Sequence, residues 1–381
     1  MANELLSLAL TQMHEQQLIN GRDREALIRL REEQRRSQEP SSIESDQPTP
    51  NLFQTAQEIA EMTPENTAWV VKGFAAEHSI TELTGHAKEA GKTSFLMGMV
   101  HSVLTGGSFL DQPTSQGTVV YLTEEKKPTF IAALQRADLM TPDIAADLHV
   151  MTYWNAAQLG WEEICNQAER QCDVTSAKLL IVDTLSQFAG FSGEQENNSG
   201  DANASLLRLQ QIAHNHPLAV IVVRHDRKSG GRVGLAGRGS GAFTAGVDVV
   251  LQLSRLDKGN WPTHRKLTAI GRYEETPKTG LVINRIASFT SREGEKKESF
   301  RWEVVGDSSA ITRQHASAEF LELLPTGEAE ALSIEQIVER SGQKSGTANN
   351  ALKQLESQGS VAKVGKGKRN DPYRYFQSGT E

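Results

Sequence analysis

A glycine-rich segment that ends in a lysine and a threonine is the part of the chain best suited to chemistry. Gly85 is followed by a short polar loop and then by Gly91, Lys92 and Thr93. Between a strand and a helix, such a loop points backbone N–H groups and the positive end of the helix dipole at an anion. The lysine then reaches the β- and γ-phosphates, and the hydroxyl ligates Mg²⁺. We therefore expect ATP and Mg²⁺ to bind at these residues.

The spacing of this segment departs from the usual phosphate-loop pattern. That pattern has four residues between its first glycine and the Gly-Lys pair, which would place the glycine where this chain has His86. The glycine is one residue earlier, at Gly85. We expect a loop that is one residue longer or that turns differently.

Acidic residues follow two apolar segments that read as buried strands. Asp183 ends the run Leu179–Val182, and Glu124 and Glu125 follow the apolar segment 117–123. At the carboxyl end of a parallel sheet, Asp183 is suited to hold Mg²⁺ directly or through water. One of the two glutamates, with Glu125 preferred, would act as base on the attacking water. The alternatives are a helix cap and a surface glutamate pair.

A third strand ends in a histidine and leads into a basic loop. The apolar run Ala219–Val223 is followed by Arg224 and His225, and the loop then carries four cations and no acid up to Gly241. These are Arg227, Lys228, Arg232 and Arg238. Such a loop suits a nucleic-acid backbone or a neighbour's nucleotide. A disordered surface loop is the competing interpretation.

Alternating apolar strands and amphipathic helices predict that these residues lie on one α/β domain with a mostly parallel, twisted sheet flanked by helices. The expected division is a charged N-terminal helix (1–36), a flexible linker (37–51), the α/β domain (52–305), a second linker (306–316) and a small C-terminal domain (317–381). The first helix reads as a solvated arm, with docking or oligomerisation as the alternative.

The C-terminal segment has the pattern of a winged helix-turn-helix. A capping box at Ser333 starts one helix, a second follows, and two short strands enclose a basic turn. The cations of this turn are Lys366, Lys368 and Arg369. They predict contact with duplex DNA, whereas a protein-docking domain is the alternative.

Composition excludes several classes of protein. No apolar run approaches the roughly 18–20 residues of a membrane span, so no membrane partner is expected. The two cysteines, Cys165 and Cys172, argue for the reducing cytoplasm and against a disulfide framework. The ten histidines show no metal-ligand spacing, and a net charge of −8 confines any DNA contact to local basic clusters.

Five short motifs in order resemble the RecA-like ATPases of the RepA type, the hexameric replicative helicases of plasmids and phages. The motifs are Gly-Lys-Thr93, Tyr-Leu-Thr-Glu-Glu125, Leu-Ile-Val-Asp183, Val-Val-Arg-His-Asp-Arg-Lys228 and Gly-Arg-Gly-Ser240. The resemblance covers about Trp69 to Ile286, and the winged helix is an addition to it.

The resemblance implies a RecA-like sheet, a homo-oligomeric ring with ATP at its subunit interfaces, and movement along single-stranded DNA. It makes Lys92 and Thr93 phosphate-loop residues, Asp183 the metal-associated acid and Glu125 the catalytic carboxylate. It further implies that His225 senses the γ-phosphate. The family's arginine finger, which comes from a neighbouring subunit, falls on Arg272, with Arg265 as the second choice.

The leading functional hypothesis is an ATP-dependent DNA translocase or helicase that replicates a plasmid, phage or integrated element. Its ring would bind one strand, and its winged helix would bind duplex DNA or a replication partner. The first alternative is a DNA-binding loader or regulator that uses ATP only as an assembly switch. A recombination ATPase that forms filaments is a third interpretation.

Overall fold

The computed structural model describes residues 53–226, 233–234, 237, 241–256, 262–278, 280–292 and 295–378. The predicted arm (1–36) and linker (37–51) lie outside these residues. The chain divides into two compact units, 1–65 and 66–381. In the described part of the first unit, helix α3 (Ala56–Met62) begins with a capping box between Thr55 and Glu58.

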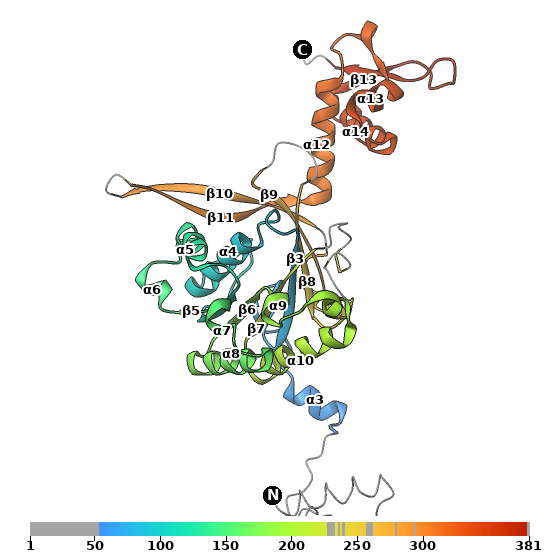
Figure 1. The fold of residues 1–381 in the computed structure, drawn as a ribbon. Helices are drawn as coiled ribbons and strands as arrows, with labels where there is room; N and C mark the ends of the chain where they lie inside the picture. Colours follow the sequence, from blue (N-terminus) through green and yellow to red (C-terminus); the bar gives the residue numbers. More distant parts are fainter. Residues whose placement is uncertain are drawn as a thin grey trace, which may run out of the picture. The chain divides into compact units, whose positions relative to one another are not determined.

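A nine-stranded sheet forms the centre of the second unit, in the order β11-β10-β9-β8-β3-β7-β6-β4-β5 (Figure 1). Its six parallel strands are β3 (Ser79–Gly85), β4 (Val119–Thr123), β5 (Leu148–Thr152), β6 (Leu179–Asp183), β7 (Ala219–His225) and β8 (Val249–Arg255). Its three antiparallel strands are β9 (His264–Gly271), β10 (Leu281–Arg292) and β11 (Glu295–Asp307). The central strands are buried on both faces, which explains their continuous apolar runs.

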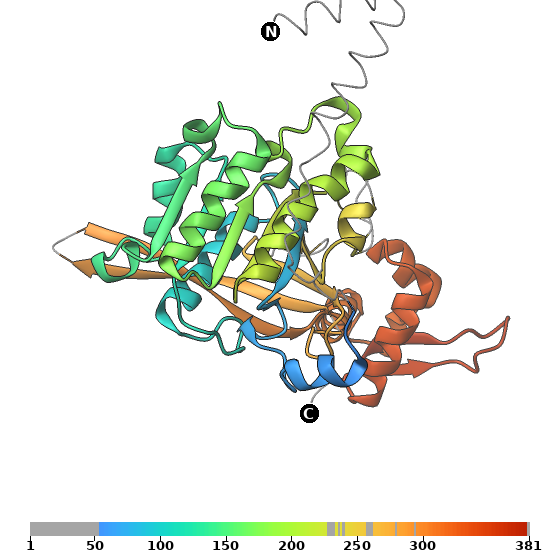
Figure 2. The same cartoon turned by 90° about the horizontal axis from the view of Figure 1, so that it is seen from below.

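Helices cover both faces of the parallel strands (Figures 1 and 2). One apolar core lies under α4 (Lys92–Thr105) and α5 (Lys127–Arg136). The other lies under α8 (Trp161–Thr175) and α10 (Ser199–Asn215) and includes both free cysteines. The expected α/β fold with a large central sheet flanked by helices is therefore confirmed.

The remaining short elements of this unit connect the main ones. They are β1 (Trp69–Val71), β2 (Ala75–Ala76), α6 (Pro142–Ala145), α7 (Tyr153–Ala156), α9 (Leu185–Phe188), the 3₁₀ helix Gly193–Asn197 and α11 (Ala242–Ala245). Within the described ranges, no helix combines the length and the apolar character needed to cross a bilayer.

The C-terminal part of the chain has its own small core. Its helices are α12 (Ser308–Leu323), α13 (Ile334–Ser341) and α14 (Ser345–Ser357), with a 3₁₀ turn at Glu328–Glu330. An antiparallel sheet in the order β12 (Leu332–Ser333), β14 (Arg374–Gln377), β13 (Val361–Val364) packs with them. The capping box predicted at Ser333 is present, with Gln336 as its partner.

The segment 306–316, expected as a linker, is mostly helical. Asp307 caps α12, because its Oδ1 accepts hydrogen bonds from the backbone N–H groups of Ser309 and Ala310 at 2.9 and 3.0 Å. Phe320, later in α12, belongs to the C-terminal core. The sequence reading overlooked the aspartate cap and took a helix start for a linker.

Candidate nucleotide-binding site

The glycine-rich segment joins the end of β3 to the start of α4 in the middle of the sheet. Gly91 caps the helix with φ of 82°, a left-handed conformation that favours glycine. Gly85 lies so close to its surroundings that a Cβ there would be 2.6 Å from the Leu253 carbonyl oxygen. Five residues separate the two glycines, and the loop turns through a backbone hydrogen bond from Ala90 N–H to the His86 carbonyl at 3.3 Å.

Lys92 is buried and lies inside this loop. Its Nζ donates to the Gly85 carbonyl at 2.8 Å and lies 3.2 Å from Nδ1 of His225. Burial lowers the pKa of Lys92, while the charges of Asp183, Asp226 and Glu124 act to raise it. The ammonium group is thus held among loop carbonyls and acids, where the β- and γ-phosphates of a nucleotide would meet it.

The two glutamates after β4 have different partners. Thr93 Oγ1 donates to Glu125 Oε1 at 3.3 Å, whereas Thr184 Oγ1 donates to Glu124 Oε2 at 2.7 Å. The second oxygen of Glu125, Oε2, is buried and accepts no hydrogen bond. Glu125 therefore has a free acceptor beside Thr93, which is what a group acting on a water molecule needs.

Asp183, at the end of β6, is buried beside these glutamates. Its Oδ2 accepts a 2.9 Å hydrogen bond from the Tyr121 hydroxyl, and its peptide bond to Thr184 is cis. Burial raises the pKa of Asp183 to about 7; Glu124 and Glu125 also raise it, while Tyr121 and Lys92 lower it. Three neighbouring carboxylates, one with an unsatisfied oxygen, form an environment that a divalent cation would stabilise.

His225 and Asp226 lie at the tip of β7, next to the phosphate loop. The strand register places His225 opposite Gly85, and the Asp226 N–H donates to the Gly85 carbonyl at 3.2 Å. Asp226 Oδ2 accepts from Gln252 at 3.3 Å, while its buried Oδ1 accepts no hydrogen bond. The sequence reading did not assign Asp226 to the site, although its position after a strand tip is the signal that identified Asp183.

The two candidate finger arginines lie at opposite edges of the sheet. Arg272 follows β9 at the amino ends of the parallel strands, where it pairs with Asp248 at 3.3 Å and is 67% exposed. Arg265 lies at the start of β9, and its Nε donates to the Ala90 carbonyl at 2.8 Å. Arg265 thus contacts the phosphate loop of its own chain, whereas Arg272 is remote from that loop.

The expected DNA contacts are described only in part. Arg227, Lys228, Arg232 and Arg238 lie outside the described residues. Lys366, Lys368 and Arg369 are exposed in the turn between β13 and β14. Asp371 orders this turn, because its Oδ2 accepts from the Lys366 N–H at 3.1 Å.

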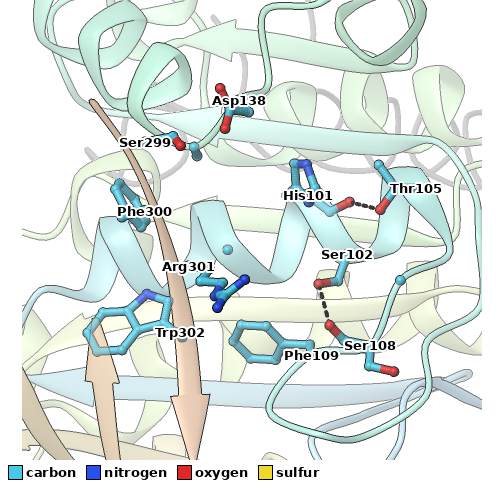
Figure 3. A pocket seen from close by; sticks show the side chains of 13 residues that line it. His101, Ser102, Thr105, Ser108, Phe109, Asp138, Ser299, Phe300, Arg301 and Trp302 are labelled. Atoms are coloured by element: carbon cyan, nitrogen blue, oxygen red, sulfur yellow. Dashed lines mark hydrogen bonds between the residues drawn. The ribbon is translucent and has the colours of Figure 1, made fainter. Parts of the chain in front are cut away.

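A second concave surface lies on the far part of α4, against β11 (Figure 3). His101, Ser102 and Thr105 of α4 line it together with Phe300 and Trp302 of β11. Burial lowers the pKa of His101, with Asp138 acting in the opposite direction. Trp302 also donates from Nε1 to the Ser94 carbonyl at 3.1 Å, so β11 contacts the first turn of the phosphate-loop helix. Sequence patterns gave no signal for this contact.

Comparisons with known proteins agree with the nucleotide site. A family model described as an AAA domain matches residues 46–231, which include the phosphate loop, both glutamates, Asp183 and His225. No curated protein matches the chain. Among solved structures, the crystal structure of the RadB recombinase is similar over 56% of this chain and 89% of that chain, with 17% identity and a TM-score of 0.41. The domain match, together with the arrangement of the site, supports a RecA-like P-loop ATPase.

Gly85→Ala should abolish nucleotide binding. The new Cβ would lie 2.6 Å from the Leu253 carbonyl and 2.7 Å from Ala90 Cβ, so the loop must move. Overpacking of this kind costs about 1–3 kcal/mol. Gly160→Ala is the matched control, because its Cβ would meet nothing within 4 Å. The measurement is binding of a fluorescent ATP analogue, with circular dichroism to verify folding. A folded Gly85→Ala protein with unchanged affinity would contradict the assignment.

Proposed function

We propose that this protein is an ATP-driven DNA translocase or helicase of the RepA type that replicates a plasmid, phage or integrated element. It acts as a homo-oligomeric, probably named hexameric ring in that family, with ATP at the subunit interfaces. The observation that carries the proposal is the grouping of Lys92, Thr93, Glu125, Asp183 and His225 around one phosphate loop. The AAA domain match over the same residues supports the ATPase part.

The contacts of these residues support a division of labour in hydrolysis. Lys92 holds the β- and γ-oxygens, and Thr93 and Asp183 would hold Mg²⁺, which neutralises charge on the phosphates when bound. Glu125 accepts the proton of the attacking water through its free oxygen. His225, next to Lys92, hydrogen-bonds the γ-phosphate and links its presence to the loop that follows.

Two basic elements would contact DNA in this proposal. The loop with Arg227, Lys228, Arg232 and Arg238 follows His225 directly and binds the single strand inside the ring. The C-terminal helices and three-stranded sheet have the elements of a winged helix, with the β13–β14 turn as its wing. This wing would bind duplex DNA.

Strand displacement is the experiment that tests the motor. ATP turnover stimulated by single-stranded DNA, together with unwinding of a forked duplex, is the expected result. Nucleotide-dependent assembly with little turnover would instead identify a loader or regulator. Filaments in place of rings, seen by electron microscopy with a non-hydrolysable ATP analogue, would identify the recombination-type ATPase.

The two DNA contacts should be separable by substitution. Glutamine at Lys366, Lys368 and Arg369 should remove duplex binding and reduce the salt dependence of log affinity by about 0.9 per contact, with stimulation by single strands retained. Glutamine at Arg227, Lys228, Arg232 and Arg238 should do the reverse. Salt-dependent binding to both DNA forms, alongside ATPase rates, is the measurement. If the first variant keeps full duplex affinity, the C-terminal domain is a protein-docking module.

A further inference from the structure

Three arginines gather at the carboxyl edge of the sheet, on strands β8, β9 and β10. Arg255 lies directly opposite Arg265 in the antiparallel ladder, and Arg265 lies opposite Ile283. Arg285 is two residues beyond Ile283. Directly paired residues and residues two apart on a strand share a face of the sheet. All three arginines are therefore on the face of Ile283, which is the face that α4 covers.

The middle arginine of this cluster is bound to the phosphate loop. Its Nε donates to the Ala90 carbonyl, and its Nη1 donates to the carbonyls of Pro262 and His264 at 2.8 and 2.7 Å. A Cβ added at Gly91 would lie 3.9 Å from Nη2. The guanidinium of Arg265 is thus fixed at the residue that precedes Lys92.

The cluster carries three positive charges and no described counter-charge. Within the described ranges, no ion pair joins Arg255, Arg265 or Arg285 to a carboxylate, and Arg285 instead lies 5.6 Å from the ring centroid of Phe300. Burial lowers the pKa of Arg265, and Arg255 and Arg285 lower it further. Like charges directly opposite each other in a sheet are destabilising. An arrangement of this kind is stabilised when an anion binds to it.

The cluster and the carboxylates flank the phosphate loop from opposite sides. The loop follows β3; the site's acids and His225 follow β7, β6 and β4, while the arginines lie on β8, β9 and β10. We infer that Arg255, Arg265 and Arg285 bind, in the same subunit, the part of the nucleotide's phosphate chain that lies toward the ribose. This inference rests on the proposed ATPase function and adds a cation cluster on the side opposite the hydrolytic residues.

The test uses the full chain with Arg255 and Arg285 both changed to glutamine. Neither side chain has a hydrogen bond to lose among the described residues, and Arg265 keeps its support of the loop. The variant should bind a non-hydrolysable ATP analogue and ADP on the order of fivefold more weakly, since both ligands carry the α- and β-phosphates. The difference should shrink at high salt, because exposed charges are screened. Arg301→Gln, an exposed arginine on β11, is the matched control.

Thermal unfolding provides a readout that a merely structural role would not produce. Without nucleotide, the double variant should unfold at an equal or higher temperature than the wild type, because repulsion is relieved. With ADP, its gain in unfolding temperature should be smaller, because binding is weaker. A lower unfolding temperature without nucleotide would show that the arginines are structural and would overturn the inference.

The remaining outcomes separate this inference from the proposed function. If the wild type binds no ATP analogue, the proposed function fails. If the wild type binds it and the double variant binds equally well at all salt concentrations, only the arginine site is wrong. Loss of single-stranded DNA affinity with unchanged nucleotide affinity would also overturn the inference and would assign the cluster to nucleic acid.

Discussion

Replacing Glu125 with glutamine is expected to reduce ATP turnover by roughly 10²–10⁴-fold while leaving ATP binding nearly intact. The amide keeps the size of the side chain and can still accept from Thr93 Oγ1. It can no longer take a proton from water, and the free oxygen at the Oε2 position is lost. Steady-state ATPase rates, with binding of a fluorescent ATP analogue measured in parallel, test this expectation.

Glu124→Gln is the control for this substitution because it removes the same charge one residue away. Glu124 Oε2 accepts the Thr184 hydroxyl at 2.7 Å, which an amide oxygen can replace, so the effect on turnover should be small. The opposite result, wild-type turnover in Glu125→Gln and none in Glu124→Gln, would transfer the catalytic role to Glu124.

The grouping of the hydrolytic residues could be predicted because each follows an apolar run. Strands of a parallel sheet end at one edge, so Asp183, Glu125 and His225 had to approach the phosphate loop wherever the strands are neighbours. The sequence did not distinguish Glu124 from Glu125. That distinction depends on which hydroxyl each side chain reaches, and Thr184 and Thr93 reach the site from different elements.

The antiparallel half of the sheet could not be predicted in the same way. Arg265 reaches the phosphate loop only because β9 runs back along β8, so that residues ten apart become direct partners. Trp302 reaches Ser94 across 208 residues of sequence, and no local pattern specifies that contact. The helix at 308–323 was missed for a simpler reason, since Gly306 suggested a break just before the Asp307 cap.

Arg272→Ala should bind ATP and assemble but turn ATP over roughly 10³–10⁵-fold more slowly, the range found for arginine fingers. Arg272 lies at the amino edge of the sheet, exposed, and pairs with Asp248 at 3.3 Å. It is remote from the loop of its own chain and accessible to a neighbouring subunit. In a shared site, mixing Arg272→Ala with Glu125→Gln subunits should therefore restore part of the activity, because some interfaces then combine an intact glutamate with an intact arginine.

Arg265→Ala is the control that gives this mixing experiment its meaning. Arg265 donates to Ala90 within its own chain, so it and Glu125 serve the same nucleotide. Every site in a mixture of Arg265→Ala and Glu125→Gln subunits lacks one of the two groups, and no activity should return. ATPase rates measured across mixing ratios distinguish the cases. Rescue by Arg265→Ala and none by Arg272→Ala would exchange their roles and make Arg265 the finger, because only a residue that acts across an interface can be complemented in this way.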